Sequence, residues 1–102
     1  MSLADRTDAE ILVELGGRLR RYRLQQNVTQ RGLAHAAGVD LRTIHNVEKG
    51  KGAQLATLVR VLRALGRLDA FDAFLPGIGL SPMELLRSGG RERQRARTGR
   101  DG

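Results

Sequence analysis

The spacing of apolar positions predicts that the chain begins with a long amphipathic helix. After Thr7 the apolar residues recur at intervals of three and four, which places them on one face of an α-helix. They are Leu12, Leu15, Leu19 and Tyr22. Thr7 and Glu10 have the spacing of a capping box, and Asn27 tolerates the left-handed conformation that ends a helix. We therefore expect a first helix over residues 8–26.

Two adjacent glycines, Gly16 and Gly17, fall inside this first helix. Each costs about 1 kcal/mol relative to alanine in a helix interior. Glycines are retained at such a position when another element packs closely against it or when the helix is locally broken. Both alternatives are consistent with the sequence.

The next segment has the pattern of two short helices joined by a tight turn. Thr29 can cap a helix over residues 30–37, and Gly38 can adopt the positive φ that a chain reversal needs. Asp40 can cap another helix, which ends near Gly50. The residues expected to turn inward are Leu33, Ala34, Ala37, Val39, Ile44 and Val47. The opposite face of the second helix is left free.

Three further segments also have helical patterns. One is closed by Gly66 and has apolar positions at Leu55, Leu58, Val59, Leu62 and Leu65. A shorter one is stopped by Pro76 and has apolar positions at Leu68, Phe71, Phe74 and Leu75. Ser81 precedes a proline and can start a last short helix over residues 82–87. The chain is therefore expected to be all-α, a compact bundle of about five short helices.

The composition limits the number of domains, the kinds of site and the cellular compartment that we expect. The 102 residues suffice for one core. There is no cysteine, so a disulfide framework and a thiolate metal site are both excluded. The chain starts without the pattern of a secretory signal and has no apolar run of membrane-spanning length. We expect a cytoplasmic protein with no membrane partner.

The charge balance favours a polyanionic partner. Eighteen Lys and Arg residues against eleven Asp and Glu give a formal net charge of +7, which attracts nucleic acid at long range. The alternative is a charge that serves solubility alone, because part of the excess lies in a C-terminal run. That run comprises Arg91, Arg93, Arg95, Arg97 and Arg100. It fits a solubilising tail, or a segment that lies along phosphates or in a minor groove.

Residues 29–50 combine the features that a DNA-reading helix pair requires. Two helices that cross steeply over a short turn need a small residue at their contact and a glycine at the reversal, here Ala34 and Gly38. The second helix then presents its outer face, which carries Leu41, Arg42, Thr43, His45, Asn46 and Lys49. Arginine suits the paired acceptors of guanine, asparagine suits adenine, and leucine or threonine can contact a thymine methyl group.

The same segment resembles the lambda-repressor-like helix-turn-helix family of Xre, Cro and CI type. The resemblance is carried by Gln30, Ala34, Gly38, Ile44, Val47, Glu48 and Gly50. With the flanking helices it extends over about residues 15–75, and it implies that the second helix of the motif enters the major groove. The chain is then divided into four parts: an N-terminal arm (1–8), a helix-turn-helix DNA-binding domain (9–76), a short C-terminal helical extension (77–88) and a basic flexible tail (89–102).

The resemblance also implies which residues contact DNA. Gln30 matches a position that binds backbone phosphate, at a helix start where free amides favour an anion. Leu41, Arg42 and Asn46 match positions that read bases, and Thr43 matches one at the groove edge. The full expected set is Gln30, Arg31, Leu41, Arg42, Thr43, His45, Asn46, Lys49 and Lys51.

A buried role is implied for two charged residues. Arg23 and Glu48 match an ion pair that ties the recognition helix to the scaffold, and a lone acid without a partner carboxylate or metal has no reaction to perform. Two residues depart from the family pattern. Asp40 stands where serine or threonine is frequent and brings a negative charge near the phosphates, and Gly32 replaces a better helix former.

No other chemistry is indicated. His35 and His45 have no acidic or thiol companion at ligand spacing, so we expect no metal, no cofactor and no catalytic residue. The cluster Arg18, Arg20 and Arg21 fits a solvated face and a phosphate clamp equally well. The set Leu68, Phe71, Phe74 and Leu75 either closes the core or forms in part a dimer contact, which we favour because one recognition helix reads few bases.

Two functions are consistent with these patterns. The leading hypothesis is a sequence-specific transcriptional regulator, a repressor that binds double-stranded DNA at a palindromic operator as a homodimer. The second is an antitoxin that binds a toxin kinase and regulates its own operon, because segments 58–71 and 81–86 resemble HipB-like antitoxins of HipA-type kinases. In that hypothesis the residues beyond Pro76 face the toxin.

Overall fold

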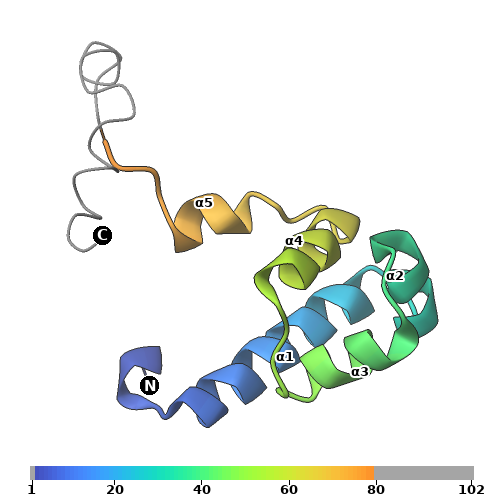
Figure 1. Ribbon diagram of the computed structural model, residues 1–102, viewed down its shortest axis with the longest axis horizontal. Helices are drawn as coiled ribbons and strands as arrows, with labels where there is room; N and C mark the ends of the chain where they lie inside the picture. The colour runs from blue at the N-terminus through green and yellow to red at the C-terminus, as the bar shows by residue number, and fades with distance from the viewer. Residues whose placement is uncertain (1, 80–102) are drawn as a thin grey trace, which may run out of the picture.

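A computed structural model describes residues 2–79, and this part of the chain is entirely helical (Figure 1). A 3₁₀ turn, η1 (Leu3–Asp5), precedes α1 (Asp8–Gln25), α2 (Gln30–Ala37), α3 (Leu41–Glu48), α4 (Leu55–Ala64) and α5 (Ala70–Phe74). The all-α class is therefore confirmed, with five α-helices in the described residues. The helix expected over residues 82–87 and the basic tail lie outside the described residues.

Local hydrogen bonds set where the first three α-helices begin. Thr7 and Glu10 form the capping box: the Glu10 amide donates to Thr7 Oγ1 at 3.2 Å, and the Thr7 amide donates to Glu10 Oε1 at 2.9 Å. At the start of α2 the Thr29 hydroxyl accepts a hydrogen bond from the Gly32 amide, and at the start of α3 the Asp40 carboxylate accepts one from the Thr43 amide. The structure thus uses these three cap residues as the sequence indicated, because capping depends on neighbours three positions away.

Gly38 closes α2 and reverses the chain toward α3. Its φ of 71° lies in the left-handed region, which a residue without a Cβ adopts at little cost. The Val39 amide then donates to the carbonyl of Ala34 at 3.0 Å, and the Gly38 amide donates to that of His35 at 3.2 Å. This pattern satisfies the last carbonyls of α2 and holds α3 steeply across it.

Gly16 is the point at which α1 touches the end of α3. A Cβ at this position would collide with the carbonyl oxygen of Val47 and lie 2.9 Å from that of Glu48. Close packing is therefore the reason for a glycine here, and α1 continues through it without a break. Gly17 has no such neighbour, since an added Cβ would meet only the Arg21 guanidinium, at 3.8 Å.

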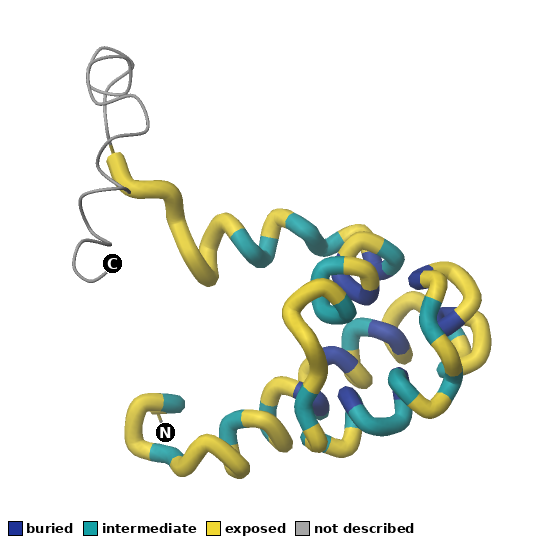
Figure 2. Tube along the Cα trace, in the orientation of Figure 1, coloured by how far each residue is buried: buried dark blue, intermediate teal, exposed yellow. Residues whose placement is uncertain are grey.

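The core lies where the second half of α1 meets α2, α3 and α4 (Figure 2). α2 packs against both α3 and α4, and α1 packs against α3. The buried apolar residues are Leu19, Leu33, Ala34, Ala37, Ile44, Val47, Val61, Leu62 and Leu65. In Figure 2 the first half of α1 and the α5 region carry few buried positions, and both extend from the same side of the bundle.

The buried stripe of α4 begins about one turn later than the sequence pattern predicted. Val61 is only 1 % exposed although the pattern did not single it out, whereas Leu55 is 62 % exposed. The stripe that meets α2 runs through positions 58, 61, 62 and 65, and Leu55 lies at the first residue of the helix, beyond its covered part. Periodicity gives the face of a helix, but the neighbour decides how far along that face is covered.

Candidate nucleic-acid interface

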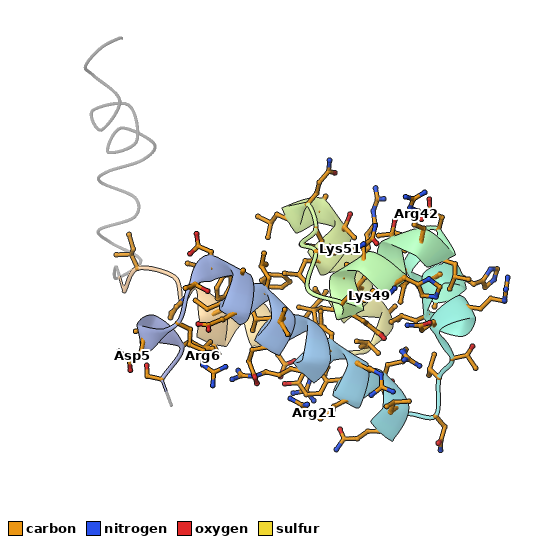
Figure 3. The ribbon with its side chains drawn as sticks, turned by 90° about the horizontal axis from the view of Figure 1, so that it is seen from below. Asp5, Arg6, Arg21, Arg42, Lys49 and Lys51 are labelled. Carbon is orange, nitrogen blue, oxygen red and sulfur yellow. The ribbon has the colours of Figure 1, made fainter. Side chains whose placement is uncertain are left out.

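α3 buries one face and leaves the other available. Ile44 is 1 % exposed and Val47 is buried beside it, so the helix is anchored through the stripe expected from the sequence. Arg42 and Lys49 are exposed. The remaining candidate residues of the outer face are partly exposed: Leu41, Thr43, His45 and Asn46. Lys51, just beyond the helix, is also exposed, and Figure 3 shows Arg42, Lys49 and Lys51 on one side of α1.

The cap of α3 limits what Thr43 can donate. Its amide donates to Asp40 Oδ1 at 2.9 Å, and its hydroxyl donates to the same oxygen at 2.7 Å. These hydrogen bonds, that of the hydroxyl first, hold the pKa of Asp40 below its ordinary value. Because a hydroxyl has a single proton, Thr43 in this arrangement can only accept a hydrogen bond through oxygen or offer its methyl group.

Gln30 lies at the start of α2 with its side chain turned toward α3. Its Nε2 donates to Glu48 Oε1 at 3.0 Å, and the residue is partly buried. The amide still has one N–H and the carbonyl oxygen for another partner. Arg31, the next residue, is exposed. The position implied by the resemblance to bind phosphate is therefore also a support for the end of α3.

Arg23 and Glu48 form a buried ion pair that joins three elements. Arg23 Nε donates to Glu48 Oε2 at 2.7 Å and Nη2 donates to Oε1 at 3.0 Å, while Nη1 donates to the carbonyl of Val28 at 2.9 Å. The two side chains are 7 % and 4 % exposed. With Gln30 as a fourth member, this network fixes the end of α3 to α1 and to the start of α2.

The network also sets the ionisation of both partners. Burial disfavours the charged form of Glu48, but the hydrogen bonds from Arg23 and Gln30 outweigh it, so the Glu48 pKa lies below its ordinary value. The hydrogen bond with Glu48 raises the Arg23 pKa above its ordinary value, against the effect of burial. Both groups are charged at neutral pH, which suits a structural pair.

A polar hollow of about 350 Å³ lies between α3 and the start of α4. Its lining residues are Thr43, Asn46, Gly52, Ala53, Gln54 and Thr57. Sequence reasoning assigned the first two to DNA and did not consider the others, because the α3–α4 connection carries no charged signal after Lys51. Gln54 precedes α4 and makes no cap hydrogen bond. The hollow therefore adds small and amide-bearing residues beside Asn46.

Two of the three clustered arginines of α1, Arg18 and Arg21, lie beside Glu14, whereas Arg20 is exposed. Glu14 accepts a hydrogen bond from Arg18 Nε at 2.9 Å, and its carboxylate lies 3.7 Å from Arg21 and 3.9 Å from Arg6. The hydrogen bond from Arg18 is the main reason that the Glu14 pKa is lowered. Figure 3 places Arg6 and Arg21 on the opposite side of α1 from Arg42 and Lys49.

The apolar set around α5 divides into two halves. Leu68 and Phe71 are partly buried and pack against the core. Phe74 and Leu75 are exposed, and the Phe74 ring lies 6.1 Å from that of Phe71. Leu68 and Phe71 therefore help to close the core, and the contact with another chain stays a prediction, for which Phe74 and Leu75 are the exposed members of the set.

Other site types find no support in the described part of the chain. Residues 2–79 contain no group of three or more His, Asp or Glu side chains placed to hold a metal ion. Within the same residues, every helix is too short or too polar to cross a bilayer.

Comparisons with known proteins agree with the helical arrangement. The family of helix-turn-helix domains matches residues 14–73, which run from the middle of α1 into α5. An uncharacterized HTH-type transcriptional regulator, y4mF, of Sinorhizobium fredii (strain NBRC 101917 / NGR234) is 40 % identical over 65 residues. That similarity covers 63 % of this chain and 83 % of the relative.

Proposed function

The chain belongs to the helix-turn-helix domain family, and from this premise we propose that it is a sequence-specific, DNA-binding transcriptional regulator whose α3 reads the major groove. The observation that carries the proposal is the anchoring of α3. Its inner face is buried through Ile44 and Val47, and its end is held by the Arg23–Glu48 pair. A helix fixed in this way presents Arg42 and Asn46 to base edges without a further cost of ordering its backbone.

The proposed DNA contacts are shared between base reading and phosphate binding. Arg42 and Asn46 read bases, Leu41 and the Thr43 methyl group contact apolar base edges, and His45 lies on the same helix. Phosphates are bound by four residues that flank this face: Gln30, Arg31, Lys49 and Lys51. Thr43 is given no donor role, because its proton is held by Asp40.

We further propose that the regulator represses transcription as a homodimer on a palindromic operator. Two recognition helices on one face of a duplex read half-sites about one helical turn apart, roughly 34–36 Å. Phe74 and Leu75, which are exposed, supply the dimer contact, while Leu68 and Phe71 support α5 against the core.

Selection from a random pool of duplexes, with the full chain, tests this proposal. An enriched motif with two inverted halves is expected, and Arg42→Ala should weaken binding to that motif by about 1–3 kcal/mol while relaxing one base position. Arg63→Ala, an exposed arginine on α4, is the matched control. Equal losses on selected and random duplexes would refute base reading by Arg42, and failure to enrich any motif would refute the regulator.

The antitoxin function concerns a different part of the chain. Ile78, 87 % exposed, is an apolar residue beyond Pro76 that a toxin could cover. The rest of the segment assigned to that contact lies outside the described residues. A kinase-like gene beside this one, and co-purification of its product with the full chain, would support this second function.

A further inference from the structure

An apolar hollow between α1 and α4 borders the polar hollow beside Asn46, with which it shares Gly52 and Ala53, but from α3 it takes only the inward-facing Val47. Its volume is about 90 Å³, and its lining is largely leucine, valine and glycine: Leu12, Leu15, Gly16, Leu19, Val47, Gly52, Ala53 and Leu58. Of the described residues, only α1, the inner face of α3, the following turn and α4 contribute to it. No residue of α5 lines it.

The leucines at the rim of this hollow are uncovered. Leu12 is 41 % exposed and Leu15 is 40 % exposed, although both belong to the apolar stripe of α1 that continues into the core at Leu19. In Figure 1 the first half of α1 and α5 leave the bundle on the same side, with α5 standing off from α1. An apolar stripe that continues beyond the core is typical of a surface that another chain covers.

The same chain carries a matching apolar projection at the end of α5. Phe74 is 63 % exposed and Leu75 is 68 % exposed. The hollow has a volume of about 90 Å³ and an aliphatic lining. Leu75, which is aliphatic and the more exposed of the two, is the better match for that lining, and the Phe74 ring would lie across the rim.

We propose that Leu75 of one copy inserts into the α1–α4 hollow of a second copy, so that two copies exchange their α5 ends about a two-fold axis. The inference rests on the homodimer of the proposed function and adds the receiving surface. Each copy donates one leucine and receives one, and this reciprocity closes the assembly at two chains. Val47 contributes its inner side only, so the outer face of α3 stays free in the dimer.

Cysteine cross-linking tests which surfaces meet. The chain has no cysteine of its own, so Leu12→Cys and Leu75→Cys each introduce a single thiol at an exposed position. Full-length chains carrying one or the other, distinguished by tags of different mass, are mixed and oxidised. A disulfide between the two variants is expected, because it forms only when the Cα atoms approach within about 7 Å. Leu24→Cys, on α1 and similarly exposed at 46 % but outside the hollow, should not join Leu75→Cys.

Other outcomes would overturn the exchange. A disulfide only between two Leu75→Cys chains would mean that α5 packs on α5. If the sample sediments as a dimer but forms no disulfide, the interface lies elsewhere on the chain. A Leu12→Cys thiol shielded from a maleimide in a monomeric sample would mean that the chain covers its own hollow.

Sedimentation without cross-linking measures the dissociation constant of the dimer, and so tests the exchange of α5 ends separately from DNA binding. Leu75→Glu should raise the dissociation constant of the free dimer by more than about a hundredfold, since two leucine side chains leave apolar contacts in each dimer. Leu24→Glu should leave it unchanged. A chain that is monomeric at all concentrations would refute both the exchange of α5 ends and the homodimer. If that monomer still enriched a DNA motif, the DNA-binding function would be retained.

Discussion

The single residue on which the position of α3 most depends is Glu48. Its carboxylate is almost fully covered and accepts hydrogen bonds from Arg23 and Gln30. Removing one member of a buried pair leaves the other charge without compensation, and this costs about 3–5 kcal/mol. The pair is thus a reason for the specific placement of α3, although an apolar pair of similar volume could be as stable.

Glu48→Ala should lower the free energy of unfolding by about 3–5 kcal/mol, because Arg23 stays buried and charged. Urea denaturation monitored by circular dichroism measures the change. The double variant Arg23→Met/Glu48→Leu removes both charges and should recover part of the loss. A double variant as unstable as the sum of the two single variants would show that the pair does not act as a unit.

Stability should fall in acid through the same carboxylate. The Glu48 pKa in the folded protein lies below its ordinary value of 4.5, so the folded state holds its proton less tightly than the unfolded state does. The contribution of Glu48 is complete above pH 4.5 and is lost as the pH falls through the folded pKa.

Urea titrations of the wild type and of Glu48→Gln, from neutral pH to below 4.5, test this dependence. The difference in unfolding free energy between the two proteins should be constant at neutral pH and shrink in acid. A difference that does not change over this range would contradict ionised Glu48 as the origin.

At the scale of the helix, Gly16 and Gly17 are neighbours with opposite roles. Gly16 faces the end of α3 and has no room for a Cβ, whereas Gly17 has open space beyond the Arg21 side chain. Both carry the entropic cost of glycine in a helix. Only Gly16 gives close packing in return.

Gly17→Ala should therefore stabilise the protein by about 0.5–1 kcal/mol, and Gly16→Ala should destabilise it by about 1–3 kcal/mol through overpacking. Thermal and urea unfolding of the two variants, which differ by one position, provide matched measurements. Stabilisation by both alanines would mean that α1 and α3 separate easily, and that the carbonyls of Val47 and Glu48 do not restrain α1.

The sequence predicted the helices well where the determinants are local. The caps at Thr7, Thr29 and Asp40 and the reversal at Gly38 each depend on residues within a few positions, and the structure contains all of them. The sequence alone could not decide between close packing and a break at Gly16, because the deciding contact is with the carbonyls of Val47 and Glu48, which lie 31 and 32 residues further along the chain.

The candidate site shows the same division. Counting around α3 from Ile44 gives its outer face without any tertiary information. The hydrogen bonds that limit Thr43 and Gln30 come from the cap and from Glu48, and spacing alone does not reveal that these side chains are already engaged. The α1–α4 hollow was not predicted either, since a stripe of leucines gives no sign of where its cover ends.

For the whole molecule, the positions of the Lys and Arg side chains decide which of them can contribute to DNA affinity. Lys51 lies on the α3 side of α1, while Arg21 lies on the other side and beside Glu14 (Figure 3). A DNA contact neutralises phosphates with cations on one face and releases counterions. The net charge of +7 attracts DNA from a distance, but only cations on the bound face should enter the salt dependence of the affinity.

Lys51→Ala should reduce the slope of log affinity against log salt by about one, with similar proportional losses on all duplexes. Arg21→Ala removes an arginine that is 64 % exposed but beside Glu14, and should leave the slope unchanged. Fluorescence anisotropy over a range of salt concentrations measures both, on a duplex with a single half-site that one copy occupies, so that assembly does not enter the slope. A reduction by Arg21→Ala equal to that by Lys51→Ala would extend the interface over α1 and restore the phosphate clamp that its arginines also fit.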